Sequence, residues 1–273
     1  MKKELLIISL IIGLIVMFGI AQADPIPYHW GTDYYANFEA HSEIGVWSQG
    51  QYVIDESICD NADTNPSEWH HNPPAETSLS ESYSYESGEW SGDSYAISDA
   101  NGIYLSSTVS TNPYVNADDN TYSKTYGWQN GYFYIDSVDK FLKVDFILNL
   151  SGNDSIGRSN HAGVDLNWYL NDYGTELGDS YTRIATVSIN WNFNNINNPS
   201  IHEDHWLIPL EKGHWYYLFA YAGETLRAYQ NDLVNGDIDL SLQISSVPIP
   251  PAGILLLPGV LGLIGIRRKV FKT

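Results

Sequence analysis

Apolar and polar residues alternate with a period of two through most of the middle of the chain. Residues 140–150 read Lys-Phe-Leu-Lys-Val-Asp-Phe-Ile-Leu-Asn-Leu. Residues 162–170 have Val, Leu, Trp and Leu at every second position from 164 on. The same alternation runs through residues 181–193 and 237–244. A period of two predicts strands with one buried face, because successive side chains of a strand point to opposite faces of the sheet.

The remaining segments complete an all-β pattern. Residues 214–221 are aromatic on both faces, which predicts a strand in the centre of a sheet. Residues 78–87 and 101–111 also alternate, but in Ser, Thr and Tyr, and turns rich in Asn, Asp, Gly and Pro separate the runs. We therefore predict a single antiparallel β-sandwich of the jelly-roll kind over residues 24–246, with a long loop at residues 60–75.

The beginning of the chain has the pattern of a secretory signal peptide. Two lysines precede an apolar run from Leu5 to Ile20, which is followed by Ala21-Gln22-Ala23. A basic start, an apolar stretch and a small-x-small end predict export, with cleavage by signal peptidase after Ala23. An uncleaved membrane anchor is the alternative. Residues 1–23 are thus predicted to be absent from the mature protein.

The end of the chain is apolar in a different way. Residues 247–266 contain no charged residue, and Arg267, Arg268 and Lys269 follow them. About 20 apolar residues cross a bilayer as a helix, and a basic cluster stays on the cytoplasmic side. Residues 247–273 are thus predicted to form a membrane-spanning segment with a basic tail.

This C-terminal segment resembles the PEP-CTERM sorting signal of Gram-negative bacteria. The resemblance rests on a Pro motif, Val247-Pro248-Ile249-Pro250, on a Gly- and Leu-rich span and on the tail Arg267-Arg268-Lys269. Ile249 stands where the name-giving form has Glu, so the motif is more similar to the Val-Pro-Leu-Pro branch of these signals. The resemblance is confined mainly to the last 25 or so residues and concerns sorting alone.

The resemblance implies an itinerary for the protein. A membrane cysteine protease, exosortase, would be its processing partner and would cleave near the Pro motif. The protein would be retained in the inner membrane by its C-terminal helix, then reach the cell surface or the extracellular matrix. Bacteria that carry such signals usually make exopolysaccharide, which is therefore a further expected partner.

The charge balance restricts the other partners. The chain has 13 Lys and Arg against 33 Asp and Glu, and six of those basic residues lie in the two terminal segments, so the middle is more acidic than the net −20 of the whole. Such a surface repels phosphate backbones, which argues against nucleic-acid binding. The single cysteine, Cys59, excludes an intramolecular disulfide, and we predict that it is a small buried residue.

No cofactor is expected, although calcium is a hypothesis. The strongest candidate is the segment that holds Asn116, Asp118, Asp119 and Asn120, since alternate Asp and Asn oxygens on a tight loop suit this ion. A weaker one is residues 61–65. Neither segment has the Gly and Glu positions of an EF-hand, and the favoured alternative for both is a turn that caps itself with side chain-to-backbone bonds.

Catalytic motifs are not evident in the sequence. His202-Glu203-Asp204-His205 has the wrong spacing for a zinc protease helix, and the serines of residues 80–87 lack the strained turn of a hydrolase nucleophile. We therefore expect no enzymatic activity.

Tryptophan residues provide candidates for carbohydrate contact, because sugars stack on exposed aromatic faces. Trp47, Trp69, Trp90 and Trp128 lie in polar surroundings typical of turns, whereas Trp168, Trp191 and Trp215 lie in strand patterns and are predicted to serve the core. Two functions remain open. The first is a non-enzymatic surface or matrix protein with a structural or adhesive role among exopolysaccharides. The alternative is a carbohydrate-binding (lectin-like) or carbohydrate-active module.

Overall fold

A computed structural model of the chain describes residues 23–28, 36–48, 50–63, 74–85, 88–112, 119–136, 140–153, 160–229 and 232–246. Apart from Ala23, the predicted signal peptide lies outside these residues, and so does the whole predicted sorting signal, residues 247–273. Within the described ranges there is no helix with the length and apolar character that crossing a bilayer requires.

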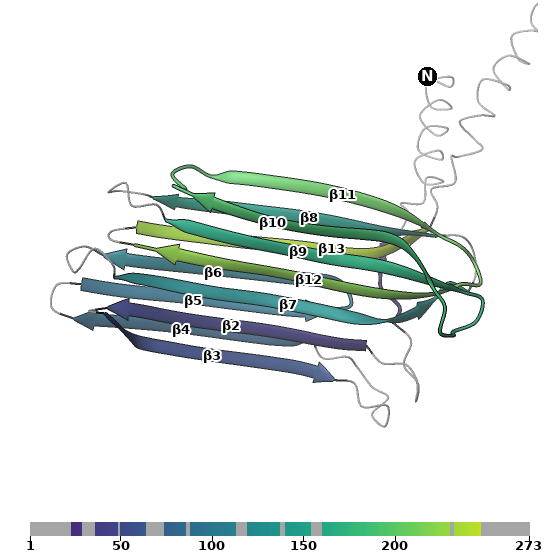
Figure 1. Cartoon of the computed structure of the whole chain (residues 1–273), viewed down its shortest axis with the longest axis horizontal. Coiled ribbons are helices and arrows are strands. Elements are labelled where there is room, and N and C mark those ends of the chain that lie inside the picture. Colours follow the sequence, from purple (N-terminus) through teal and green to yellow (C-terminus); the bar gives the residue numbers. More distant parts are fainter. Residues whose placement is uncertain are drawn as a thin grey trace, which may run out of the picture. The chain divides into compact units, whose positions relative to one another are not determined.

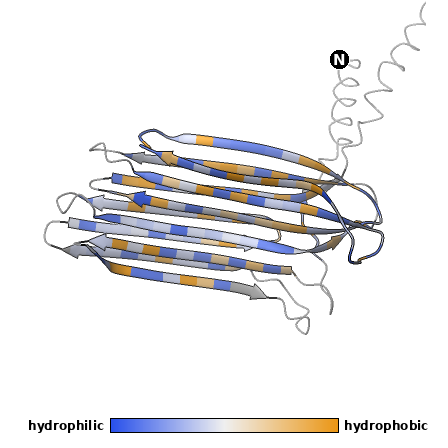
Figure 2. Ribbon diagram, viewed as in Figure 1, coloured by the Kyte–Doolittle hydropathy of each residue, from blue (hydrophilic) through white to orange (hydrophobic). Residues whose placement is uncertain are grey.

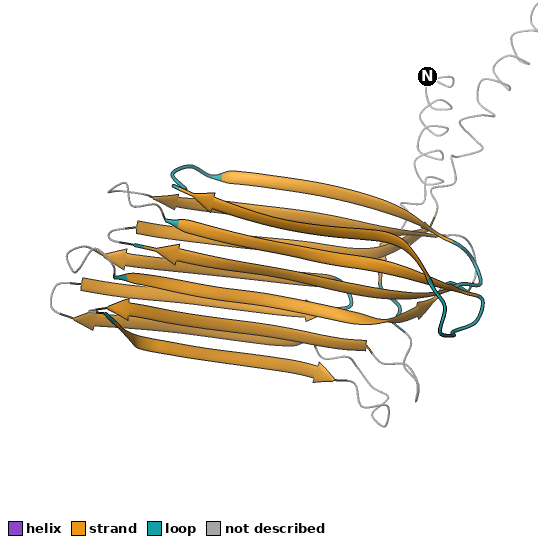
Figure 3. Cartoon of the chain, viewed as in Figure 1, coloured by secondary structure: helices purple, strands orange, loops and turns teal. Residues whose placement is uncertain are grey.

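All regular elements of the described residues are β-strands (Figure 3). They are β1 (Ala23–Pro25), β2 (Ala36–Ser48), β3 (Gln51–Asp63), β4 (Ala75–Tyr85), β5 (Gly88–Asp99), β6 (Gly102–Asn112), β7 (Asn120–Tyr134), β8 (Lys140–Asn153), β9 (His161–Gly174), β10 (Thr182–Asn194), β11 (Ser200–Leu210), β12 (Trp215–Ala228) and β13 (Asp232–Ser246). Residues 60–63, which we predicted to begin a long loop, instead belong to β3. Their backbone pairs with β2, and this pairing extends the strand beyond the point where its apolar pattern ends.

The strands of the described residues form two antiparallel sheets that lie one over the other (Figure 1). The six-stranded sheet has the order β10-β9-β12-β7-β2-β3. The seven-stranded sheet has the order β11-β8-β13-β6-β5-β4, with β1 as its seventh strand. The prediction of an all-β antiparallel sandwich is therefore confirmed. The central position predicted for residues 214–221 is also confirmed, because β12 pairs with β9 on one side and β7 on the other.

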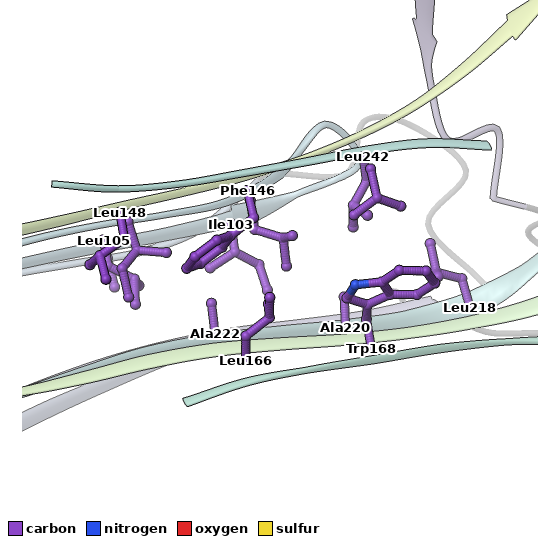
Figure 4. Close-up of a cluster of buried hydrophobic side chains, with 14 of the residues drawn as sticks. Ile103, Leu105, Phe146, Leu148, Leu166, Trp168, Leu218, Ala220, Ala222 and Leu242 are labelled. Atoms are coloured by element: carbon purple, nitrogen blue, oxygen red, sulfur yellow. The ribbon is translucent and has the colours of Figure 1, made fainter. Parts of the chain in front are cut away.

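The apolar half of the core lies between β8, β13 and β6 on one side and β9, β12 and β7 on the other. Hydrophobic and hydrophilic positions alternate along these strands (Figure 2), so each sheet turns one apolar face inward. Phe146, Leu148 and Leu242 point from the seven-stranded sheet toward Leu166 and Trp168 of the six-stranded one (Figure 4), and all five are buried. Burial of these side chains is the main source of stability of the sandwich.

The interior between β2, β4, β5, β6 and β7 holds buried hydroxyl groups beside its apolar side chains. Ser42 of β2 meets Thr77 of β4 at 2.8 Å between their hydroxyl oxygens. Thr125 of β7 lies 2.6 Å from Ser94 of β5 and 2.6 Å from Ser107 of β6. Buried hydroxyl groups must be hydrogen-bonded to avoid a desolvation penalty, and here they satisfy one another across the two sheets. The Ser- and Thr-rich strands of the sequence therefore pack through hydrogen bonds as well as through apolar contacts.

Candidate functional site

The outer side of the six-stranded sheet carries a row of aromatic rings on each of its two inner strands. Every second residue of β7 and β12 is buried, so the residues between them face outward. We call the outer side of β9, β12, β7, β2 and the start of β3 the aromatic face. Its rings on the two inner strands are Tyr122, Tyr126, Trp128, Tyr132, Tyr134, Trp215, Tyr217, Phe219 and Tyr221.

The rings at one end of the aromatic face contact each other across three strands. Tyr132 of β7 and Tyr217 of β12 have ring centroids 4.9 Å apart, and Tyr169 of β9 stacks on Phe219 of β12 at 5.1 Å. Tyr134 and Trp215 form a further pair at 5.0 Å. Because these residues are cross-strand neighbours, the sheet itself holds their rings in one layer.

Toward β2 and β3 the layer of rings continues. Tyr126 stacks on the His41 imidazole with centroids 4.5 Å apart, and its ring lies 6.0 Å from that of Tyr221. Trp47 and Tyr52 form an edge-to-face pair at 4.8 Å, where β2 turns into β3. The aromatic face therefore extends from β9 to β3.

These rings are half-buried rather than covered. They pack against neighbouring rings and stay partly in contact with solvent; Tyr52 is 53% exposed and Tyr134 38% exposed. A contiguous layer of partly exposed rings is uncommon on a protein surface and makes this face the candidate binding surface.

Carboxylates lie among the rings and fix some of them. The Tyr122 hydroxyl donates to Glu43 Oε1 at 2.8 Å and lies 3.1 Å from Asp55 Oδ1, so it shares its proton between two carboxylates. Burial, followed by these two negative groups, holds the pKa of Tyr122 well above its usual value. Burial and the neighbouring Glu39 raise the pKa of Tyr126 to about 12. Both tyrosines are therefore neutral at physiological pH.

Only a few cations lie on the aromatic face. The Arg183 guanidinium lies 4.0 Å from the ring centroid of Tyr169 and donates to Asn171 Oδ1 at 3.1 Å. Lys124 lies 5.7 Å from the ring centroid of Tyr126. Each of these cations is close to a ring or an amide of the face.

The outer side of the seven-stranded sheet is different. Ser91 bonds Ser110, Ser106 donates to Asp237 and Thr108 donates to Asn235, with distances of 2.7 Å, 2.7 Å and 2.9 Å. These side chains satisfy their hydrogen-bonding groups within the sheet. Its described ring contact is the pair Tyr95 and Tyr104, 6.1 Å apart. The two outer faces of the sandwich thus have contrasting chemistry.

The predicted carbohydrate contacts have mixed outcomes. Trp47 and Trp128 lie on the aromatic face, although within strands rather than turns. Trp90 is wrong as a sugar contact, because it occupies an inward position of β5 and is 1% exposed, packed against Tyr83. Trp69 lies outside the described residues.

Of the three tryptophans predicted to serve the core, two do so and one does not. Trp168 is 1% exposed, which confirms that prediction, and Trp191 packs against the core cluster. Trp215 is not a core residue. It alternates with the buried Tyr216 and so faces outward, since both faces of β12 carry aromatic residues and the pattern alone does not distinguish them.

Half of the predicted calcium segment is described. Asp119 is buried and accepts a hydrogen bond from Ser48 Oγ at 3.2 Å, and Asn120 begins β7. Asn116 and Asp118 lie outside the described residues. Among the residues that are described, no group of three or more His, Cys, Asp and Glu side chains is arranged to hold a metal ion.

Two further sequence features are placed by the strands. Cys59, predicted to be buried, is exposed, because β3 is an edge strand and Cys59 pairs with the outward-facing His41. His202 and His205 lie on opposite sides of β11: His202 packs on Trp191 at 5.3 Å between ring centroids, and His205 Nδ1 lies 2.9 Å from Asp145 Oδ1.

Neither a protein-family model nor a curated protein sequence matches this chain. Among solved structures, it is similar to the enzymatically active domain of bacteriophage CBA120 tailspike protein 4 over 60% of this chain and 19% of that one, with 8% identity and a TM-score of 0.19. It is similar to the CBM22-1 and GH10 modules of Clostridium thermocellum endo-1,4-beta-D-xylanase 10B over 54% of this chain and 22% of that one, with 10% identity and a TM-score of 0.17.

A carbohydrate-binding module of the β-sandwich superfamily is also similar, over 81% of this chain and 96% of that one, with 7% identity and a TM-score of 0.15. The chain spans only about a fifth of the length of the tailspike and xylanase chains. At TM-scores this low, none of these likenesses bears on function.

Most of the aromatic face was not predicted from the sequence. A usable signal was present in β7, where Tyr122, Tyr126, Trp128, Tyr132 and Tyr134 share one parity. The same signal recurs in β12. When every second residue of a strand is aromatic and the residues between them are apolar or small, the apolar and small residues face the core. The aromatic residues then form a stripe on the outer side of the sheet.

Proposed function

We propose that this protein is a non-enzymatic surface or matrix protein that binds an uncharged polysaccharide through the aromatic face. The layer of partly exposed rings across β9, β12, β7 and β2 is the observation that carries the proposal. This proposal combines the two functions that the sequence left open, because a matrix protein that binds polysaccharide is both adhesive and carbohydrate-binding.

Stacking provides the physical basis. The C–H faces of a sugar ring are apolar and flat, and they pack on the electron-rich face of an aromatic ring with release of water from both. The outward row of β12 covers four successive outward positions, which span about 20 Å at two residues per step. A row of this length matches several consecutive sugar units and favours a polymer over a single sugar.

Hydrogen bonding and charge favour a ligand without carboxylate or sulfate groups. Glu39, Glu43 and Asp165 are acceptors among the rings, and sugar hydroxyls are donors that match them. The net charge of −20 acts in the same direction, because it repels a polyanion at long range. Uncharged glycans therefore fit the aromatic face better than uronic-acid polymers.

Pull-down of the full chain on insoluble cellulose and chitin, and affinity electrophoresis in gels with soluble xylan or alginate, test the proposal. We expect binding to at least one uncharged polysaccharide and none to alginate. Trp128→Ala and Tyr217→Ala should each weaken binding about tenfold, as for residues that carry much of a binding energy. Tyr104→Ala removes a ring from the opposite face and is the matched control.

Two results would contradict the proposal. One is binding that Tyr104→Ala weakens as much as Trp128→Ala does. The other is a protein that binds none of these glycans and sediments as a dimer, with Trp128→Ala restoring the monomer. In that case the aromatic face would be covered by a second copy of the chain.

The route to the cell surface is a separate proposal, supported by the two terminal sequences. We propose cleavage by signal peptidase after Ala23, inner-membrane retention by residues 247–266 and processing by exosortase near Val247-Pro248-Ile249-Pro250. Mass spectrometry of the mature protein tests this route, with an expected N-terminus at Asp24 and no Arg267-Arg268-Lys269 tail. A mature chain that begins at Met1, or keeps the tail in a strain with active exosortase, would refute it.

A further inference from the structure

Tyr122 lies flat across the neighbouring strand because its partner there is a glycine. Gly45 of β2 is the cross-strand partner of Tyr122 on β7. A Cβ atom on Gly45 would lie 2.0 Å from Cε1, 2.4 Å from Cζ and 2.7 Å from the hydroxyl oxygen of Tyr122. These distances are shorter than non-bonded heavy atoms allow. The ring therefore occupies the space that any side chain at position 45 would fill.

Tyr221 is placed by a second glycine in the same way. A Cβ atom on Gly223 of β12 would lie 2.5 Å from the Tyr221 hydroxyl oxygen and 3.0 Å from its Cζ. Gly223 is buried although it belongs to the outward parity of its strand, because the ring of Tyr221 covers it. Neither glycine has a positive φ, so its role here is close approach and not backbone freedom.

A tyrosine that lies down over a glycine presents its ring face to solvent, whereas one that stands upright in a crowded layer presents only an edge. Sugar stacking requires the face. Each of the two rings also has acceptors at its rim. Glu43 and Asp55 hold the Tyr122 hydroxyl, and the negative charge of Asp165 acts on Tyr221, whose cross-strand partner is Asn167.

We propose that Tyr122 and Tyr221 are two sugar-stacking subsites of the aromatic face, each for one uncharged pyranose unit. Gly45 and Gly223 are the positioning residues that expose the two ring faces. This inference rests on the proposed polysaccharide-binding function and assigns its contact points.

The two subsites are separated by a distance that suits one glycan chain. Gly45 pairs with Tyr122, and Gly223 pairs with Tyr126, four residues farther along β7. The offset is therefore about 14 Å along the strands and, across the two strand spacings from β2 to β12, about 10 Å. A polysaccharide chain that crosses the strands obliquely would reach both rings and cross β7 near Lys124, which lies midway between the two levels.

Adding one methyl group tests the inference without removing any ring. Gly45→Ala and Gly223→Ala should each lift the neighbouring tyrosine. We expect each variant of the full chain to bind about fivefold to tenfold more weakly to the uncharged polysaccharide that the wild type binds. The displaced atoms belong to side chains and not to backbone, and the largest loss is that of the Tyr122 hydrogen bonds to Glu43 and Asp55, so we expect both variants to fold with a melting temperature lowered by less than about 8 °C.

Gly163→Ala is the matched control. Gly163 lies in β9 at an outward position, and a Cβ there would meet Asn192 Oδ1 and His161 Nε2 at 3.7 Å, which is ordinary contact. This variant adds the same methyl group to the same face and displaces no ring. It should bind like the wild type.

A double-mutant cycle identifies the route of the effect. If Gly45 acts through Tyr122, Gly45→Ala should cost nothing further in a Tyr122→Ala background, and the same holds for Gly223 with Tyr221. A wild-type chain that binds glycan while Gly45→Ala and Gly223→Ala bind equally well would overturn this inference and leave the proposed function standing. Equal losses with and without the tyrosine would also overturn it. A wild-type chain that binds no glycan in the panel would overturn both.

Discussion

At the scale of single residues, Glu224 has the most unusual environment. It lies on β12 with its side chain between the two sheets, 2% exposed, beside Ser107 of β6 and close to Gly236 of β13. Burial, with a smaller contribution from Asp237, raises the pKa of Glu224 to about 8, and Ser107 opposes this shift only in part. The folded protein therefore keeps this carboxyl group protonated at neutral pH.

Glu224 makes stability depend on pH in a defined direction. The folded state binds the proton more tightly than the unfolded chain, so the stabilising effect is complete below pH 4.5 and is lost as pH rises toward 8. Between pH 4.5 and pH 7 the loss amounts to about 3 kcal/mol of the free energy of unfolding. Glu224→Gln should remove this dependence, because glutamine keeps the shape and does not titrate.

Urea unfolding at pH 5, 6, 7 and 8 measures this effect. The difference in unfolding free energy between Glu224→Gln and the wild type should grow steadily with pH. Glu203→Gln, which changes an exposed glutamate of β11, is the control and should show no such trend. A constant difference between wild type and Glu224→Gln across these pH values would mean that the buried carboxyl group does not titrate as described.

At the scale of single elements, the pleat of each strand decides which side chains the core receives. Ile189 of β10 packs against the core cluster, while its neighbour Ser188 is exposed. Ile189→Asp should lower the free energy of unfolding by about 2 kcal/mol, because it places a carboxylate against the apolar core. Ser188→Asp should change it by less than about 0.5 kcal/mol. Thermal or urea unfolding measures both, and similar losses would contradict the assignment of faces.

Elements with strong local alternation were predictable from the sequence. The strands β8, β9 and β13 match their apolar patterns, and β12 was correctly predicted to be central. What the sequence did not reveal is which side of a strand faces inward when both sides suit burial. A shift of one residue exchanges the two faces, so Trp215 was assigned to the wrong side. Trp90 was predicted to lie in a turn because its neighbours are polar, whereas it is an inward residue of β5.

The candidate site was less predictable, for a different reason. The aromatic face depends on which strands are neighbours. Tyr169 and Phe219 lie 50 residues apart in sequence, and only the pairing of β9 with β12 brings their rings together. Gly45 likewise meets Tyr122 only because β2 pairs with β7. The sequence therefore indicated aromatic strands but not the surface that they form together.

At the scale of the whole molecule, the charge is the dominant feature. A net charge of −20 brings carboxylates close enough to repel one another, and that repulsion weakens the compact state. Sodium chloride should therefore raise the melting temperature of the full chain, most steeply below about 0.15 M, where the Debye length exceeds about 8 Å. A melting temperature that is independent of salt would contradict this account.

Calcium provides a related comparison. At equal ionic strength, calcium chloride should raise the melting temperature no more than sodium chloride does if charge screening is the only effect. A larger increase, abolished by Asp118→Asn together with Asp119→Asn, would instead establish the calcium site that the sequence suggests at residues 116–120.

The central claim is that one face of the sandwich binds polysaccharide and the other does not. Hydroxyl-radical footprinting of the full chain, with and without a bound uncharged polysaccharide, measures both faces in one experiment. We expect protection of Tyr126, Trp128, Tyr217 and Tyr221 on the six-stranded sheet and none of Tyr95 or Tyr104 on the seven-stranded sheet. Protection of Tyr95 and Tyr104 alone, or of both faces to the same extent, would contradict the account.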